Sequence, residues 1–214
     1  MIDKYIIFDL DGTIIDSFEG MKESIKYSLK QIKLDIVDEK IINQFIGYPL
    51  IDSYMKYFKV DEKVANYLVS FYRDYYKEQG VLNARIYEGI IDVIKELKKM
   101  GYKIAIVSLK PKVFVYRILK NLGIFENFDN IVGIDWNNYE VTKIDLMNQF
   151  IELIKLDLTN SYFIGDRNYD ILTGQRFGVK TIGVSYGYGT IEELESASPN
   201  YIVHSPREII EIVI

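Results

Sequence analysis

The sequence predicts an α/β protein with a doubly wound parallel sheet and a small helical insertion. Three observations support this prediction. An unbroken apolar strand ends at two aspartates, strands and helices alternate from residue 87 onward, and a long helical stretch separates the first strand from the second. A short apolar run without polar breaks is typical of a strand buried on both faces. Regular alternation is typical of a parallel sheet covered by helices.

The first predicted strand, Tyr5–Phe8, runs directly into the segment Asp9-Leu10-Asp11-Gly12-Thr13. Gly12 frees the backbone to turn. Ligands of open parallel sheets bind outside the carboxyl ends of the strands, and two acids concentrated there would repel each other unless a cation joined them. The alternative is a solvated turn, for which Asp and Gly are the usual residues.

A helical insertion is predicted between the first two strands. Apolar residues at three- and four-residue steps predict a helix from Phe18 to Ile32, with Ser17 placed to cap it. Asp11 and the next convincing strand, at Lys103, lie 92 positions apart (103 − 11), whereas a strand-helix-strand unit needs roughly 30 residues. We therefore expect a core domain at residues 1–15 and 84–214 and a helical cap domain at residues 16–83. Further cap helices are expected at Glu39–Phe45, Leu50–Phe58 and Glu62–Lys77.

The second part of the chain alternates regularly. A helix through Ile90, Ile94 and Leu97 is expected to end before Gly101, with lysines in its last turn. Right-handed crossovers would bring the carboxyl ends of the strands to one edge of the sheet. The later strands are predicted at Lys103–Ser108, Asp129–Ile134, Ser161–Gly165 and Lys180–Val184, and the later helices at Pro111–Gly123, Thr142–Leu156 and Asn168–Phe177.

The composition excludes several kinds of site and partner. The 214 residues include no cysteine and one histidine, His204, which excludes disulfides, thiolate zinc sites and histidine clusters. A metal would have to be bound by oxygen, which favours Mg²⁺. A net charge of −5 and a pI of about 5.1 argue against a nucleic-acid surface. Without a membrane-length apolar run or a signal-peptide pattern, we expect a cytoplasmic protein that does not bind membranes.

Side chains capable of catalysis collect at the predicted sheet edge. Asp9 and Asp11 follow the first strand, Ser108 ends the second, and Asp166 and Asp170 follow the fourth. Two separate strands thus deliver carboxylates to one crevice. This repetition favours a functional site over ordinary turn chemistry.

Lys143 lies at the start of a helix that enters from the same side. The helix dipole disfavours a cation in the first turn by roughly 0.3–1 kcal/mol, and Thr142 with Asp145 makes a cap that would work with a neutral residue at position 143. A lysine at this position indicates that its ammonium group faces an anion. The alternative is a lysine whose charged end reaches water.

These residues occur in the order, and on the elements, that resemble the haloacid dehalogenase (HAD) superfamily of phosphohydrolases. The motifs are Asp9-Leu-Asp11-Gly-Thr13, Ser108, Lys143 and Gly165-Asp166-x-x-x-Asp170, and they span the whole chain. The insertion resembles the small helical cap that one subclass carries between its first and second motifs. Three stretches look like the phosphoglycolate phosphatase-like or 5′-nucleotidase-like branch: Ser-Leu-Lys-Pro at 108–111, Gly-Asp-Arg-Asn-Tyr-Asp at 165–170, and the tail Gly-Tyr-Gly-Thr-Ile-Glu-Glu-Leu from 187.

The resemblance implies a Mg²⁺-dependent phosphatase that acts on a small phosphorylated metabolite. Asp9 would attack phosphorus and form an aspartyl-phosphate, and Asp11 would protonate the leaving oxygen and later take a proton from water. The Asp9 carboxylate, the Asp11 backbone carbonyl and Asp166 would hold Mg²⁺, with support from Asp170. Three residues would hold the phosphoryl oxygens: Thr13, Ser108 and Lys143.

The chain departs from the family pattern at two phosphate-binding positions. Leu109 stands where the related branch usually has Ser or Asn, so only its backbone N–H could bind phosphate. Lys143 lacks the proline that follows it in many relatives. Lys110 is therefore a competing candidate for the same charge.

Two further residues are candidates for substrate binding. Tyr48 belongs to a loop, residues 47–50, that resembles the cap loop facing the active site in relatives, and it could stack on a base or sugar. The alternative is an ordinary turn between helices. Arg167 could reach an anionic group of the substrate or form a surface salt bridge. The cap is expected to set specificity by closing over the crevice and excluding water.

Other functions stay open at this stage. A phosphomutase of the β-phosphoglucomutase kind shares the same acids and cap position. A receiver-type signalling module also accepts phosphate on an aspartate at a strand end, although it needs neither a leaving-group acid like Asp11 nor a cap. A non-catalytic binding protein is disfavoured because every acid of the motifs is present. The protein is expected to be a monomer or a dimer.

Overall fold

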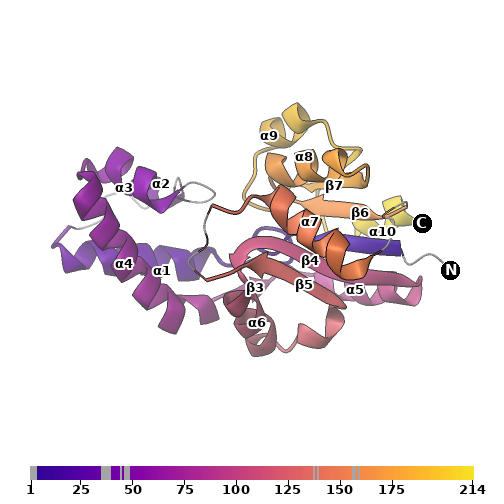
Figure 1. Ribbon diagram of the computed structural model, residues 1–214, viewed down its shortest axis with the longest axis horizontal. Coiled ribbons are helices and arrows are strands. Elements are labelled where there is room, and N and C mark those ends of the chain that lie inside the picture. Colours follow the sequence, from indigo (N-terminus) through magenta and orange to yellow (C-terminus); the bar gives the residue numbers. More distant parts are fainter. Residues whose placement is uncertain are drawn as a thin grey trace. The chain divides into compact units, whose positions relative to one another are not determined.

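The computed structural model describes residues 4–34, 40–43, 45, 49–136, 138, 140–155, 158 and 160–214. The chain forms two compact units, drawn in Figure 1. The core unit comprises Met1–Asp16 and Arg85–Ile214, and the helical unit comprises Ser17–Ala84.

A six-stranded parallel sheet forms the centre of the core unit. Its strand order is β5-β4-β1-β6-β7-β8, so the direction of the crossovers reverses at the central strand β1. Ligand sites of open α/β sheets lie at such a switch point. The predicted doubly wound parallel sheet is confirmed, and β8 is a strand that the sequence did not reveal. The strands are β1 (Lys4–Phe8), β4 (Tyr102–Pro111), β5 (Asn130–Ile134), β6 (Tyr162–Gly165), β7 (Lys180–Val184) and β8 (Tyr201–Val203).

Helices cover both faces of this sheet. Figure 1 shows α7, α8 and α9 on one side and α5 and α6 on the other, as right-handed crossovers on either side of β1 require. The helices of the core unit are α5 (Ile90–Lys99), α6 (Lys112–Asn121), α7 (Lys143–Ile154), α8 (Asn168–Arg176), α9 (Ile191–Ala197) and α10 (Glu208–Val213), with a short 3₁₀ helix at Phe125–Asn127.

Strand β4 ends differently from the prediction. It continues past Ser108 to Pro111, and its register with β5 shifts between these two residues. Pro111, predicted to open the next helix, pairs with Ile134 and stands at the N-cap of α6. A register shift of this kind is a bulge, and bulges change the direction of side chains near active sites.

The core under α7 depends on the alternation of side chains along β1. Tyr5 and Ile7 point to one face and pack in a buried cluster with Met147 and Phe150 of α7. The ring of Phe150 meets that of Tyr5 edge to face at 5.3 Å between centroids. This packing fixes α7, and with it the lysine that begins the helix.

The helical unit has an apolar core of its own, which includes Leu29, Tyr54 and Leu68. The hydroxyl groups of Tyr54 and Ser28 form a buried hydrogen bond of 2.6 Å. Ser17 precedes the first helix but makes no side-chain capping bond to it, contrary to the prediction. The helices are α1 (Phe18–Gln31), α2 (Lys40–Asn43), α3 (Leu50–Phe58) and α4 (Glu62–Glu78), followed by a 3₁₀ helix at Gly80–Leu82.

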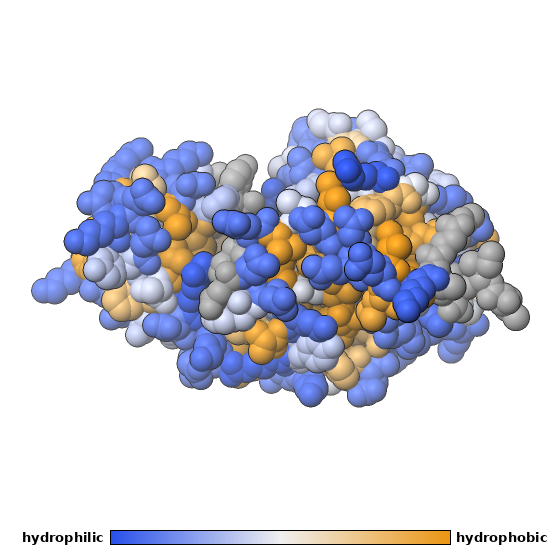
Figure 2. Space-filling model, viewed as in Figure 1, coloured by the Kyte–Doolittle hydropathy of each residue, from blue (hydrophilic) through white to orange (hydrophobic). Residues whose placement is uncertain are grey.

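Two short strands that the sequence did not reveal lie where the chain leaves and re-enters the core unit. They are β2 (Ile15–Asp16) and β3 (Arg85–Ile86), and they pair antiparallel. The surface seen in Figure 2 is mostly hydrophilic, with apolar side chains showing in strips. Within the described residues, no helix combines the length and apolar character needed to cross a bilayer.

Phe150→Ala should destabilise the core unit by about 3–5 kcal/mol, because the substitution removes a fully buried ring and leaves a cavity. The free energy of unfolding in urea measures the effect. Leu153→Ala is the matched control on the same helix, because Leu153 is 59% exposed; its cost should stay below about 0.5 kcal/mol. Equal costs for both variants would contradict this account of α7.

Candidate active site

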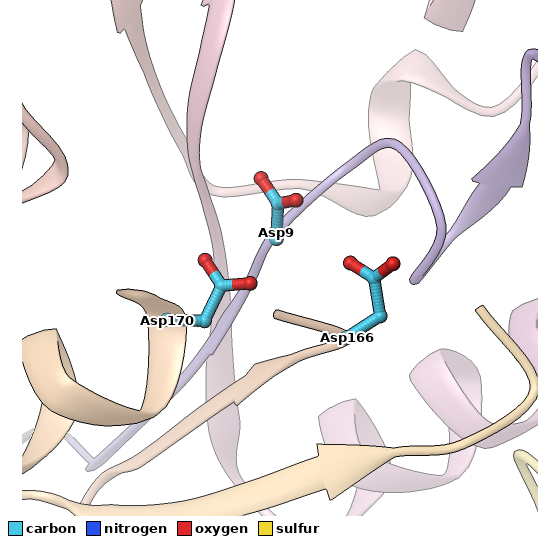
Figure 3. A group of neighbouring side chains, drawn as sticks. All are labelled: Asp9, Asp166 and Asp170. Atoms are coloured by element: carbon cyan, nitrogen blue, oxygen red, sulfur yellow. The ribbon is translucent and has the colours of Figure 1, made fainter. Parts of the chain in front are cut away.

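Three aspartates from separate segments converge at the carboxyl edge of the sheet. Asp9 follows β1, Asp166 follows β6, and Asp170 lies in the first turn of α8. One carboxylate oxygen of each lies within 4.8 Å of the others, and Figure 3 shows the three side chains pointing into a shared space. All three are at most 4% exposed. The structure thus brings together three of the acids that the sequence singled out.

Lys143 supplies positive charge to this cluster. Its Nζ lies 2.6 Å from Asp9 Oδ1 and 2.9 Å from Asp170 Oδ1, and the residue is 3% exposed. The predicted cap of Thr142 and Asp145 is present at the start of α7. Burial alone would lower the pKa of Lys143, but the charges of Asp170 and Asp9 together outweigh burial and raise the pKa above its usual value. The ammonium group therefore faces carboxylates, not water.

Aromatic rings complete the surroundings of Lys143. Its Nζ lies 5.8 Å from the ring centroid of Phe163 and 5.6 Å from that of Tyr169. A cation over an aromatic face is attracted by the ring quadrupole. With two carboxylates and two rings around it, this ammonium group is held firmly in place.

The positive charge of one lysine does not balance three buried carboxylates. Burial, followed by the charges of Asp170 and Asp9, raises the pKa of Asp166 to about 8. Burial also raises the pKa of Asp170 to about 7, although Lys143 acts in the opposite direction. At neutral pH the cluster therefore resists full ionisation unless another cation is bound.

The backbone holds Asp166 in one orientation. Its Oδ2 accepts a hydrogen bond from the N–H of Tyr188 at 2.8 Å, whereas its buried Oδ1 has no hydrogen-bond partner within the described part of the chain. Gly12, with φ +80°, and Gly187 approach this side chain so closely that an added Cβ would lie 2.2 Å from Oδ2 or 2.4 Å from Cβ. One oxygen is thus fixed by the protein and the other is left for a ligand.

Asp11 and Lys110 form a second ion pair, separate from the three-aspartate cluster. Lys110 Nζ donates to both carboxylate oxygens of Asp11, at 2.9 Å to Oδ1 and 2.8 Å to Oδ2. The Lys110 and Asp11 side chains are 7% and 24% exposed. Lys110 and Lys143, the two candidates for one phosphate-binding role, therefore have different partners.

Two other residues predicted to bind phosphate follow β1 or lie in β4. Thr13 is fully buried, and its Oγ1 has no hydrogen-bond partner among the residues described. Ser108 is buried near the end of β4, where its Oγ accepts the N–H of Lys110 at 3.3 Å. The Leu109 side chain packs against the apolar cluster under α7.

Of the two candidates for substrate recognition, Arg167 belongs to the described residues, and its backbone N–H donates to Asp170 Oδ2 at 3.1 Å. Tyr48 lies outside the described residues. The Nε of Arg167 donates to Glu193 Oε1 at 2.9 Å, which is the salt-bridge alternative that the sequence left open. Tyr188 is a contact of the site that the sequence did not reveal: besides its N–H bond to Asp166, its hydroxyl donates to Asp16 Oδ1 at 2.9 Å. The sequence signals for this loop were its flanking glycines and the resemblance of the stretch from Gly187 to one branch of the family.

Comparisons with known proteins identify the family of the chain. Residues 6–184 match the model of a family described as "Haloacid dehalogenase-like hydrolase". A 5′-nucleotidase of Pseudomonas aeruginosa is 31% identical over 196 residues, which cover 92% of this chain and 89% of that protein. Pyrophosphatase PpaX of Oceanobacillus iheyensis is 28% identical over 208 residues, 97% of this chain and 95% of that protein. The crystal structure of a candidate phosphatase from Clostridium difficile superposes with a TM-score of 0.94 and 33% identity over 100% of both chains.

Asp166→Asn should stabilise the metal-free chain, and more so at pH 8 than at pH 5. A carboxyl whose pKa is raised to about 8 in the folded state keeps its proton as the pH rises, whereas the unfolded chain releases it near 3.8. Stability is therefore lost between these pH values, by at most about 1.4 kcal/mol per unit of pKa difference. Asparagine has no carboxyl proton to release, so Asp166→Asn removes this loss of stability. Urea unfolding in the presence of EDTA at both pH values measures it.

Asp92→Asn, at an exposed position of α5, is the control. It should change the free energy of unfolding by less than about 0.5 kcal/mol at either pH. A destabilising effect of Asp166→Asn at pH 8 would mean that Asp166 is not under electrostatic strain.

Proposed function

Since the chain belongs to the haloacid dehalogenase-like hydrolase family and is a phosphatase of that family, we propose that it is Mg²⁺-dependent and hydrolyses small phosphate monoesters through a covalent phosphate on Asp9. The observation that carries this proposal is the convergence of Asp9, Asp166 and Asp170, with Lys143 paired to the first and the last of them. Uncatalysed hydrolysis of phosphate monoesters is so slow that accelerations up to about 10²¹-fold are needed, which binding alone does not supply.

The donor set fits Mg²⁺. It consists of oxygen atoms, and one of them, Asp166 Oδ1, is buried with no partner in the described part of the chain. Hard cations with oxygen ligands are typical of phosphoryl-transfer sites. Asp9, the Asp11 backbone carbonyl and Asp166 would hold the ion, and Asp170 would support them. When bound, Mg²⁺ would offset the negative charge of the carboxylates and of the incoming phosphate.

In the first step, a carboxylate oxygen of Asp9 attacks phosphorus, and the bond between phosphorus and the leaving oxygen breaks. The carboxyl group of Asp11 gives its proton to that oxygen, so the product leaves as an alcohol. Lys143, 2.6 Å from Asp9, orients the nucleophile. The new bond joins phosphorus to Asp9 as an aspartyl-phosphate.

In the second step, water attacks the phosphorus atom and gives a proton to the Asp11 carboxylate. The bond from phosphorus to Asp9 breaks, inorganic phosphate leaves, and both aspartates return to their first state. Thr13 Oγ1, Ser108 Oγ and Lys143 Nζ would hold the phosphoryl oxygens during both steps. The unpartnered hydroxyl of Thr13 supports this role.

Nucleoside 5′-monophosphates and phosphoglycolate are the substrates that we propose first. The relatives named 5′-nucleotidase and pyrophosphatase support a small phosphorylated compound. Phosphate release from a panel of nucleoside monophosphates, phosphoglycolate, pyrophosphate and sugar phosphates would rank these classes.

Asp9→Asn should lower phosphate release from p-nitrophenyl phosphate by at least about 10³-fold, because the amide is not a nucleophile. The fold should persist, as shown by an unchanged circular dichroism spectrum. Asp135→Asn is the matched control: Asp135 follows β5 as Asp9 follows β1 but is exposed and lies outside the cluster. Full activity of Asp9→Asn would refute the assigned nucleophile.

Removal of divalent ions with EDTA should stop turnover, and Mg²⁺ should restore it. Mg²⁺ should also raise the unfolding temperature of the wild-type chain, because a ligand that binds only the folded state stabilises it. Asp166→Asn should lose most of this rise. Restoration of activity by Zn²⁺ but not by Mg²⁺ would contradict the assignment of the ion.

A further inference from the structure

We propose that Lys110 is a positioning residue that fixes the direction of the Asp11 carboxyl group, the proton carrier of the reaction. This inference rests on the proposed function and extends it. The two lysines of the site then have separate tasks: Lys143 serves the nucleophile Asp9, and Lys110 serves Asp11.

The contact between Lys110 and Asp11 restrains both the position and the orientation of the Asp11 carboxyl group. Because Nζ donates to both oxygens, at 2.8 and 2.9 Å, the plane of the carboxyl group is held as well as its position. Charge-assisted hydrogen bonds are stronger than neutral ones. The Lys110 side chain is 7% exposed, so water screens the pair less than it would screen an exposed one.

Asp11 lies beyond the end of β1, and Lys110 contributes to holding its carboxyl group there. Asp9 is held by Lys143 and belongs to the buried cluster, whereas the carboxyl group of Asp11 lies outside that cluster. The turn that follows contains Gly12 at φ +80°. A proton carrier must reach hydrogen-bond distance of the leaving oxygen, and a misplacement of 1 Å can cost about 10²-fold in rate.

An irregularity in the backbone of β4 sets the position of Lys110. The register with β5 shifts between Ser108 and Pro111, and this bulge carries Lys110. Opposite it, Gly133 has no side chain, and a Cβ added there would lie 2.7 Å from the carbonyl oxygen of Lys110 and 3.1 Å from Lys112 Cα. The bulge therefore depends on a glycine in the neighbouring strand.

The alternative is that Lys110 binds the phosphoryl group itself. The two roles predict different dependence on the leaving group. Every phosphate monoester presents the same phosphoryl group, so loss of a phosphate-binding lysine should slow all esters alike. Loss of a residue that positions the proton carrier should have its largest effect on esters whose leaving oxygen must be protonated.

Lys110→Met tests this difference. The measured quantity is kcat/KM, which reports the steps through phosphoryl transfer to Asp9, for p-nitrophenyl phosphate and for a simple alkyl phosphate. p-Nitrophenolate leaves as a stable anion, whereas an alkoxide requires the proton from Asp11. Since general acid catalysis contributes about 10²–10⁴-fold, Lys110→Met should lose at least about tenfold more activity on the alkyl ester than on the aryl ester.

Three further variants complete the experiment. Gly133→Ala keeps every charge but should displace Lys110, and so should reproduce the preference for the aryl ester. This variant keeps the proposal testable if Lys110→Met folds poorly. Combining Lys110→Met with Asp11→Asn should cost no more on the alkyl ester than Asp11→Asn alone. Lys112→Met, at an exposed position in the first turn of α6, is the matched control and should leave both rates unchanged.

Two outcomes would overturn the role of Lys110 while leaving the proposed function intact. One is an equal loss on both esters, which would make Lys110 a phosphate-binding residue. The other is multiplication of the losses in the double variant. The proposed function would instead be refuted by full activity of Asp9→Asn, or by a wild-type chain that releases no phosphate from either ester. Neither of these two results depends on Lys110.

Discussion

The site depends on an imbalance of charge at the carboxyl edge of the sheet. Asp9, Asp166 and Asp170 present oxygens within 4.8 Å of one another, and two unit charges 4 Å apart repel by about 4 kcal/mol at an effective dielectric constant of 20. Lys143 offsets one negative charge. The rest is met by retained protons, as the raised pKa values of Asp166 and Asp170 show, or by a bound cation. The packing of β1, β6, α7 and α8 brings these acids together in a group that could hold a metal ion.

The backbone approaches one member of the cluster, Asp166, very closely. Around Asp166, Gly12 and Gly187 come so close that one added carbon at either would overlap the side chain. The N–H of Tyr188 holds one oxygen. The Asp166 side chain is therefore held by a backbone hydrogen bond in a space that only glycines at positions 12 and 187 leave open. The position of Asp166 therefore depends on the main chain of two neighbouring segments.

Much of this arrangement follows from the sequence, and the exceptions have physical reasons. Parallel strands bring their carboxyl ends to one edge, so the apolar runs before Asp9 and Asp166 were enough to predict that these acids meet. The pairing of Lys110 with Asp11 was not predictable, because it depends on a bulge in β4 and on Gly133 in another strand. The contact of Tyr188 with Asp166 is a backbone bond from a loop, and backbone donors carry no side-chain signature. Strand β8 and the ribbon of β2 and β3 are only two or three residues long, too short for periodicity to reveal.

The proposed chemistry and the choice of substrate place different demands on the chain. Every residue assigned to phosphoryl transfer, from Asp9 to Asp170, belongs to the core unit. The residues assigned to hold the phosphoryl group would contact a part that all phosphate monoesters share, so they would not distinguish one leaving group from another. Discrimination must come from contacts with the leaving group. Side chains outside the assigned set make those contacts, and changes to them should alter the substrate without altering the reaction.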